Sequence, residues 1–432
     1  MKNISKIIST FFLSLSIIML LYVFYRSEIY SGGSRYDYYS KYYIISFSLI
    51  CLSFASFFLR KEIKIRIGLI ILSFTVCIYL IEGYMAIIGN PYYLYTYLKK
   101  KDPNVTVYVS PFNHLNEVNQ KNFPLSGISY RKTIFCNEGG YMSTYQSDRY
   151  GFNNPDSEWD KKEIKFILVG SSIVHGACVN ENDTIGGNLR SITEIKKGVL
   201  NLGYSENRAV TKYATLREYM PLKNTNNVLW IYHEAYDLHD FEIEFDNKIL
   251  LKYLNNKEFS QNLYLNQKNI EKKLHTTLLN QEKLEKRNIF SRLIKLTYLR
   301  AATIEKLFPP KDIFRNDYLS SSLLSKFEKV IKLSKEFVES NGANFYFIYL
   351  PEFHRYSNKY YYHRDNEEIY KKIIQSVRNL NIPIIDINAE IFEKHKNPLS
   401  LFQDHYGHFN EKSYQLVAKT IFQKIQEYER KK

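Results

Sequence analysis

Lys165-Phe-Ile-Leu-Val-Gly-Ser-Ser-Ile-Val-His-Gly176 is the stretch that decides the fold of this 432-residue chain. Its apolar run Phe166–Val169 has the length of a short buried strand, and small residues follow at once. Gly170 permits a tight turn, and residues 182–195 have a helical pattern. The stretch therefore predicts a strand-to-helix turn that presents the Ser172 hydroxyl close to a helix N-terminus, where N–H groups can stabilise an anion. A serine that merely caps the helix explains the same pattern.

Apolar runs alternate with helical stretches over the C-terminal part of the chain. Continuous apolar runs are typical of parallel strands buried on both faces. We expect strands at Phe166–Val169, Gly198–Leu202, Asn227–Tyr232, Ala343–Leu350 and Ile382–Ile385. We expect helices at Asn182–Ile195, Arg208–Met220, Leu323–Ser340, Asn366–Leu380 and Glu411–Glu429. The alternation predicts an α/β fold in which helices sandwich a parallel sheet.

A long insertion, about residues 241–319, separates the third and fourth predicted strands. Leu and Ile recur there at helical spacing among Lys, Asn and Gln, which predicts two or three amphipathic helices. The insertion is either a lid or side subdomain over the site, or a packing appendage without substrate contact. Nothing in the sequence separates these two roles.

The first 89 residues are expected to form three transmembrane helices. Ile7–Tyr25, Tyr42–Leu59 and Ile67–Ile88 are long and apolar enough to span about 30 Å of hydrocarbon. The first stretch lacks a small-residue cleavage site, so we interpret it as a retained anchor. A basic loop over residues 60–66 predicts a cytoplasmic N-terminus. The chain is therefore expected to be a multi-pass protein of the cytoplasmic membrane, with its C-terminal domain extracytoplasmic.

The remaining chain is divided into a linker and cap segment at residues 90–160 and an α/β domain at 161–432. Glu82 lies within the third apolar stretch, where a carboxylate is a functional candidate. Because it falls near the predicted outer end, we interpret it as reaching the headgroups.

The formal net charge of +15 bears on which classes of molecule the chain can bind. A basic domain outside the membrane attracts anionic lipid or anionic polysaccharide, whereas nucleic acid is not expected there. A lysine-rich solvated surface explains the same charge.

Four cysteines divide between the two parts of the chain. Cys51 and Cys77 lie in predicted spans and are interpreted as small apolar residues. Cys136 and Cys178 lie outside, where disulfides persist. We predict a Cys136–Cys178 disulfide that joins the cap segment to the rim of the site; two buried thiols are the alternative.

Three blocks of this chain resemble motifs of the SGNH (GDSL) hydrolases. Gly170-Ser171-Ser172-x-x-x-Gly176 resembles the first motif, Gly-Asp-Ser-x-x-x-Gly, with Ser171 in place of Asp. Gly203 resembles the glycine of the second motif. His408-Phe-Asn410, ahead of a predicted helix, resembles the closing His-x-Asn block. The resemblance covers about residues 145–425 and is greatest to the membrane-anchored bacterial branch.

The resemblance implies a flavodoxin-like SGNH sheet and a set of site residues. Ser172 would be the nucleophile and His408 the base. Either Asp404 orients His408, or a Ser172–His408 dyad suffices. The N–H groups of Ser172 and Gly203 would form the oxyanion hole. The family's third block carries an Asn donor, and Tyr236 stands in that place here. No cofactor and no metal site is expected.

Other polar residues near these motifs receive no catalytic assignment. His175 is interpreted as a rim residue, and His233, Glu234 and His405 have no assigned role.

The function implied by the resemblance is that of an extracytoplasmic serine esterase or acyltransferase. It would act on O-acyl groups, such as O-acetyl, of bacterial cell-envelope polysaccharide through an acyl-Ser172 intermediate. Expected partners are the acylated carbohydrate or another ester, the lipid bilayer and, as a candidate, a membrane acyltransferase. The alternative is a catalytically degenerate SGNH-like subunit that binds or assembles components in polysaccharide modification or export.

Overall fold

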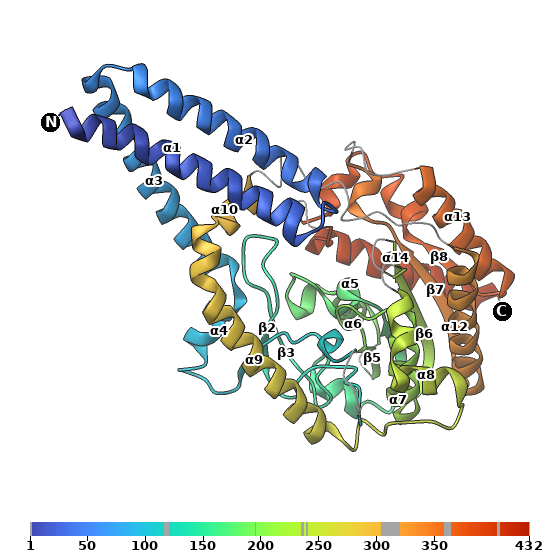
Figure 1. Cartoon of the computed structure of the whole chain (residues 1–432). Coiled ribbons are helices and arrows are strands. Elements are labelled where there is room, and N and C mark those ends of the chain that lie inside the picture. Colours follow the sequence, from blue (N-terminus) through green and yellow to red (C-terminus); the bar gives the residue numbers. More distant parts are fainter. Residues whose placement is uncertain are drawn as a thin grey trace. The chain divides into compact units, whose positions relative to one another are not determined.

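The computed structural model describes residues 2–115, 121–194, 196–234, 237–238, 241–303, 320–357, 364–403 and 407–431 (Figure 1). The chain divides into two compact units. One comprises Met1–Ile87 with Asn288–Arg315, and the other comprises Ile88–Arg287 with Asn316–Lys432. The predicted insertion is therefore shared between the two units, which the sequence did not indicate.

The N-terminal unit contains three helices long and apolar enough to cross a membrane, over Lys6–Tyr30, Tyr36–Phe58 and Lys61–Gly89. They are α1 (Lys2–Phe24) with a π-helical extension (Tyr25–Tyr30), α2 (Tyr36–Ala55) with a 3-10 turn (Ser56–Phe58), and α3 (Lys61–Gly89). The second and third begin before the predicted apolar stretches, because the helix continues through polar flanking residues. Hydroxyl pairs join α1 to α2: Ser16 lies 3.1 Å from Ser53, and Ser56 donates to Ser9 at 2.9 Å.

Glu82, on α3, is fully buried and does not extend outward as the sequence suggested. Its carboxylate accepts hydrogen bonds from the N–H groups of Tyr298 at 3.1 Å and Leu299 at 2.7 Å, at the start of α10 (Thr297–Ala302). The same unit contains a hydrogen bond of 3.3 Å from the Tyr79 hydroxyl to the carbonyl of Ile294. The carboxylate is tolerated because backbone donors satisfy it. This part of the insertion, residues 288–303, thus belongs to the N-terminal unit.

The larger unit is built on a five-stranded sheet in the order β5-β4-β6-β7-β8 (Figure 1). The strands are β4 (Glu163–Val169), β5 (Lys197–Asn201), β6 (Asn224–His233), β7 (Asn344–Leu350) and β8 (Ile384–Asp386). All neighbouring pairs are parallel. Numbered in chain order, the five strands lie in the order 2-1-3-4-5. The connections therefore run in opposite directions on the two sides of β4. Ligands of open α/β sheets collect at such a point.

Alternate residues of the strands face two separate cores. Ile167 and Val169 belong to one core, and Phe166 and Leu168 to the other. The first core contains α7 (Ala209–Tyr219), α12 (Ser321–Ser340) and α13 (Arg364–Asn379). The second contains α6 (Ile185–Ile192) and α14 (Glu411–Lys431). The predicted sandwich is confirmed, although α6 is shorter than expected because the Thr184 hydroxyl caps it through the Gly187 N–H at 2.9 Å.

The cap segment contains α4 (Pro91–Leu98) and a small sheet in the order β1-β2-β3. Its strands are β1 (Val105–Val107), β2 (Lys132–Ile134) and β3 (Thr144–Gln146). A buried Asp148 fixes the turn-rich lead-in to β4 by accepting from the N–H groups of Tyr150 and Phe152, the Asn154 amide and the Trp159 indole. Burial raises the pKa of Asp148 to about 6.

Two helices of the insertion lie in the larger unit, at least in part. They are α8 (Lys248–Asn255) and α9 (Gln267–Ile294), whose residues up to Arg287 belong here. Ile249, Leu250, Ile270 and Leu274 are buried in the first core, so these helices complete the fold.

Candidate active site

Ser172 is the first residue of α5 (Ser172–His175), a one-turn helix directly after β4. The sequence predicted the turn but not this short helix ahead of α6. Gly170 allows α5 to fold back on the strand, because a Cβ there would lie 2.2 Å from Cγ2 of Val174. Gly176 ends the helix with φ +92°, a conformation that favours glycine. The turn thus presents the Ser172 hydroxyl at the carboxyl edge of the sheet.

His408 reaches Ser172 from the far end of the domain. Its Nε2 lies 2.9 Å from the Ser172 Oγ, across 236 positions of sequence. The adjacent Phe409 is buried in the second core. Asn410 caps α14 by accepting from the Ser413 N–H at 3.1 Å, and its amide donates to the carbonyl of Ser400 at 2.8 Å. The His-x-Asn block therefore fixes the chain directly after His408.

Glu138 is the functional candidate that the sequence interpretation missed. Both of its carboxylate oxygens lie 2.8 Å from Nδ1 of His408. Both side chains are only about one-sixth exposed, at 15% for His408 and 16% for Glu138. A carboxylate on Nδ1 holds the imidazole tautomer whose Nε2 can accept the serine proton. Ser172, His408 and Glu138 have the connectivity of a hydrolase triad.

The cap segment is fastened to the site by the bond between Cys136 and Cys178. These cysteines form a disulfide with a Cα–Cα distance of 5.0 Å. Gln403 donates to the carbonyl of Cys178 at 3.1 Å, and a Cβ on Gly139 would lie 3.1 Å from the Gln403 Oε1. Glu138 is therefore held between a covalent anchor at Cys136 and a close contact of Gly139 with Gln403. The predicted disulfide was the one signal in the sequence that could have drawn attention to Glu138.

The position assigned to Asp404, beside Nδ1 of His408, is held by Glu138 in the structure. Asp404 and His405 lie outside the described residues, as does Tyr236, the residue in the place of the family's Asn donor. Asp404 was assigned because the SGNH family often carries an Asp three residues before the base histidine and Asp404 lies four before His408, whereas the carboxylate observed there comes from a separate segment.

Gly203 differs from the role that the resemblance implied. Its N–H donates to the Asn201 Oδ1 at 2.9 Å and is thus engaged within its own loop. Glycine is required at this position by packing, because a Cβ would lie 2.4 Å from Cγ1 of Val174. The Ser172 N–H, at the start of α5, is the remaining oxyanion donor among the described candidates, since the first N–H groups of a helix lack intrahelical partners.

His175 is buried and does not line the rim. Its Nδ1 accepts from the Ser205 N–H at 3.1 Å, so its Nε2 carries the proton and donates to the Tyr145 hydroxyl at 2.9 Å. The ring stacks on Tyr204 with 4.4 Å between centroids. Burial lowers the pKa of His175 to about 3, so it stays neutral and joins α5 to the cap segment.

The next strands also end in buried ionisable groups. Glu234, after β6, pairs with Arg355 at 2.5 Å. Burial, together with the neighbouring Glu234, raises the pKa of Glu352 to about 8, so this carboxyl is protonated at neutral pH. Lys212 on α7 pairs with Asp237, the residue after Tyr236, and donates to the Ile231 carbonyl at 2.9 Å. These contacts fix the backbone around the end of β6.

Metal ligation has little support at this site within the described residues. Glu138, Cys178 and His408 offer potential ligand atoms within 4.8 Å of one another. The Cys178 sulfur is in a disulfide, and metal ligation requires the thiolate. Only two donors are left, and both are already engaged with each other.

No protein-family model and no curated protein matches the chain. Solved structures that it resembles include a protein from Desulfitobacterium hafniense DCB-2 assigned to the lipolytic G-D-S-L family. That match has a TM-score of 0.33 and 14% identity, and covers 60% of this chain and 97% of the other. The psychrotrophic esterase EstA from Pseudoalteromonas sp. matches with a TM-score of 0.30 and 12% identity, covering 61% of this chain and 98% of that enzyme. At such scores the functional argument depends on the geometry of the site alone.

Proposed function

We propose that this chain is a serine esterase or O-acyltransferase that forms an acyl-Ser172 intermediate. The observation that carries the proposal is the hydrogen-bonded series from Ser172 Oγ to His408 Nε2 at 2.9 Å and from His408 Nδ1 to Glu138 at 2.8 Å. Nucleophile and base lie within hydrogen-bond reach, and a third group orients the base, as nucleophilic catalysis requires. The strand order is consistent with a flavodoxin-like SGNH assignment, which remains part of the proposal.

Acyl transfer uses these groups in two steps. Ser172 Oγ bonds to the ester carbonyl carbon while His408 Nε2 takes the serine proton. The tetrahedral intermediate then expels the alcohol, which receives that proton from His408. Glu138 stabilises the imidazolium that exists between these events. Water or a sugar hydroxyl next attacks the acyl-enzyme by the same proton transfers, giving hydrolysis or transfer respectively.

The oxyanion would be stabilised by the Ser172 N–H, with Tyr236 as a second candidate donor. Each donor in such a site typically contributes about 100- to 1,000-fold in rate. The Gly203 N–H joins them only if its bond to Asn201 opens when substrate binds. We therefore expect a slower enzyme than one with three free donors.

The proposed substrate is an O-acylated, for example O-acetylated, polysaccharide of the bacterial cell envelope. Support comes from the three potential membrane spans and from the basic residues between the second and third, which favour a cytoplasmic loop and an extracytoplasmic domain. A disulfide in the larger unit also suits an oxidising compartment. A membrane acyltransferase that supplies acyl groups is the proposed partner for the transfer reaction.

A non-catalytic binding or assembly subunit is the second candidate. The observation that favours it is the engaged Gly203 N–H, because one oxyanion donor is then absent in the resting site.

A fluorophosphonate probe separates the two candidates. We expect the full-length protein in detergent to be labelled at Ser172, identified by mass spectrometry of the labelled peptide. Ser171→Ala is the matched control, since it removes the adjacent hydroxyl, and it should still be labelled. Ser172→Ala should lose labelling, and His408→Gln should reduce it strongly. Release of acetate from an aryl acetate should fall to a similar extent in Ser172→Ala and His408→Gln, because the two residues act as a unit. Absence of labelling and hydrolysis in the parent protein would favour the binding subunit.

A further inference from the structure

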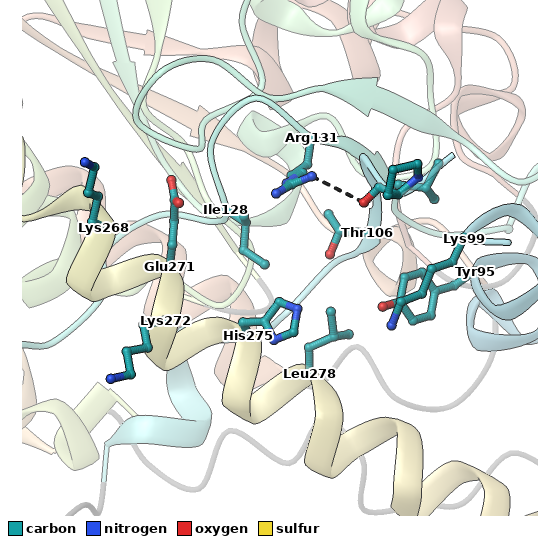
Figure 2. A pocket seen from close by; sticks show the side chains of 12 residues that line it. Tyr95, Lys99, Thr106, Ile128, Arg131, Lys268, Glu271, Lys272, His275 and Leu278 are labelled. Carbon is teal, nitrogen blue, oxygen red and sulfur yellow. Dashed lines mark hydrogen bonds between the residues drawn. The ribbon is translucent and has the colours of Figure 1, made fainter. Parts of the chain in front are cut away.

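A second concave site lies in the larger unit, between the cap segment and α9. Figure 2 shows this pocket, which has a volume of about 270 Å³. One wall is formed by α4, β1 and the residues just before β2, and the other by the first turns of α9. Its volume is slightly below the range of about 300–1,000 Å³ that is usual for small-molecule sites, so it suits a group the size of one sugar.

Positive charge dominates the lining of this pocket. Lys99 and Arg131 come from the cap segment, and Lys268 and Lys272 from α9, whereas Glu271 is the one carboxylate in the lining. Lys268, Lys272 and His275 fall on one face of α9, because positions three and four apart in a helix are neighbours. Cations from two segments far apart in sequence thus line the same pocket.

Part of this charge has no ion-pair partner among the residues that the structure describes. Lys268 and Lys272 are exposed, and neither forms an ion pair within the described part of the chain. Glu271 is engaged as the acceptor of a hydrogen bond from the Ser129 hydroxyl. Lys99 lies 3.9 Å from Glu282, a distant ion pair whose lysine is 40% exposed.

Arg131 is the most firmly positioned of these cations. One of its terminal nitrogens donates to the Asn104 Oδ1 at 2.7 Å and to the Pro103 carbonyl at 3.3 Å. A guanidinium has five N–H donors in a planar fork, so its other edge is left to pair with a carboxylate or phosphate.

The floor of the pocket is apolar. Tyr95 is buried, with the Lys99 ammonium 5.0 Å from the centre of its ring, and Val105 and Leu278 are buried beside it. Apolar walls with a few polar groups that fix orientation are typical of ligand sites. A sugar ring offers an apolar face together with polar substituents, which fits this combination better than a bare inorganic anion does.

We propose that this pocket binds a carboxylate- or phosphate-bearing sugar of an anionic polysaccharide. Arg131 precedes β2 and Glu138 follows it, so the pocket and the triad lie toward opposite ends of that strand. Seven residue-to-residue steps separate Arg131 from Glu138 and span at most about 25 Å, a length that several linked sugars can bridge. The pocket would therefore hold one part of a polymer while another part reaches Ser172; only this last step rests on the proposed function.

Binding is tested by calorimetry on the full-length protein in a neutral detergent, in a Ser172→Ala background that cannot turn over. The probes are an oligogalacturonate, a neutral oligosaccharide of the same length and inorganic phosphate. We expect the oligogalacturonate to bind, with an affinity that falls as salt rises, and the neutral oligosaccharide to bind at least tenfold more weakly.

Two variants localise the binding to the pocket. Arg131→Gln should weaken oligogalacturonate binding by about tenfold or more, because it removes a charged hydrogen-bond donor. The double variant Lys268→Gln with Lys272→Gln alters only exposed side chains and keeps the test valid if Arg131→Gln does not fold. Lys283→Gln is the matched control: it removes one exposed charge from α9 outside the pocket and should weaken binding less than twofold.

Several outcomes would overturn the proposal. Equal affinity for acidic and neutral oligosaccharides, no binding of either, or equal weakening by Lys283→Gln and the pocket variants would each exclude a specific anionic-sugar site. Phosphatidylglycerol vesicles could also displace the bound oligogalacturonate. Displacement at a lipid concentration similar to that of the oligogalacturonate would assign the pocket to lipid headgroups instead. The binding assay uses the Ser172→Ala background, so a lack of esterase activity in the parent protein would not affect the binding result. A failure to bind the oligogalacturonate would likewise leave the test of esterase activity unaffected.

Discussion

Replacing Glu138 by Gln is the sharpest test of the proposed triad. The substitution keeps the size of the side chain and removes the negative charge that lies 2.8 Å from Nδ1 of His408. The amide can also rotate its NH₂ group toward Nδ1, which would leave the proton on Nε2, facing Ser172. Both effects weaken His408 as a base for the serine hydroxyl.

The size of the effect follows from the geometry of the pair. Two unit charges about 4 Å apart interact by about 4 kcal/mol at an effective dielectric constant of about 20, the value suited to a site near the surface. A hydrogen bond to a charged group independently contributes about 1.5–3 kcal/mol. Because the Glu138 and His408 side chains are only 16% and 15% exposed, little of this is lost to water. Since about 1.4 kcal/mol is tenfold in rate, we expect kcat to fall by about 100- to 1,000-fold.

The assay is hydrolysis of an aryl acetate by the full-length protein in detergent. Glu411→Gln is the matched control, because Glu411 is a neighbouring carboxylate that accepts from the Tyr141 hydroxyl at 2.8 Å and does not contact His408 in the structure. It should change kcat less than threefold. Asp404→Asn, at the residue first assigned to this role, should cost less than Glu138→Gln.

Retention of more than a third of the parent kcat by Glu138→Gln would refute the triad. A larger loss in Asp404→Asn than in Glu138→Gln would restore the original assignment and reduce Glu138 to a structural contact.

The remaining predictions concern the disulfide, the buried histidine and the orientation in the membrane. Replacing Cys136 and Cys178 together by Ser should destabilise the larger unit by about 4 kcal/mol in the chain-entropy model, and it should lower kcat by freeing Glu138. In the denatured, non-reduced parent protein, only the two thiols of Cys51 and Cys77 should be alkylated. Alkylation of four thiols would contradict the disulfide. Because burial lowers the pKa of His175 to about 3, the unfolded chain binds a proton between about pH 6.5 and pH 3 that the folded chain does not. Stability should therefore fall with falling pH across that window by about 1.4 kcal/mol per pH unit for this group, and His175→Gln should make thermal unfolding less dependent on pH; an unchanged dependence would contradict the assignment. A reporter that is active only outside the cytoplasm should be active when fused after Lys432, whereas activity of a cytoplasmic reporter there would reverse the proposed orientation.

The main elements of the α/β fold could be predicted from local sequence. The apolar runs became the five strands because a parallel strand covered on both faces must be apolar along its length. Element ends were less predictable: β4 begins at Glu163 rather than Phe166, since a polar residue still pairs with neighbours when it lies at the sheet margin. The three apolar stretches likewise became helices long enough to cross a membrane.

Ser172 and His408 could be identified because each lies within a local pattern. The strand, the small residues and the helix start surround Ser172, and the His-x-Asn block surrounds His408 with a buried Phe409 and a capping Asn410. Such patterns arise from contacts between residues close in sequence, which the chain itself displays.

The tertiary structure alone decided which carboxylate meets His408, because that contact joins positions 270 residues apart. Glu138 lies in a segment with little regular structure, where its side chain is positioned by the Cys136–Cys178 disulfide and by the packing of Gly139 on Gln403. The engagement of the Gly203 N–H by Asn201 and the burial of Glu82 under the α10 amides are further contacts of this kind. The sequence by itself determined the main strands and helices of the α/β domain and pointed to Ser172 and His408, whose signals are local, whereas the carboxylate beside His408 depended on long-range contacts that form only when the chain is folded.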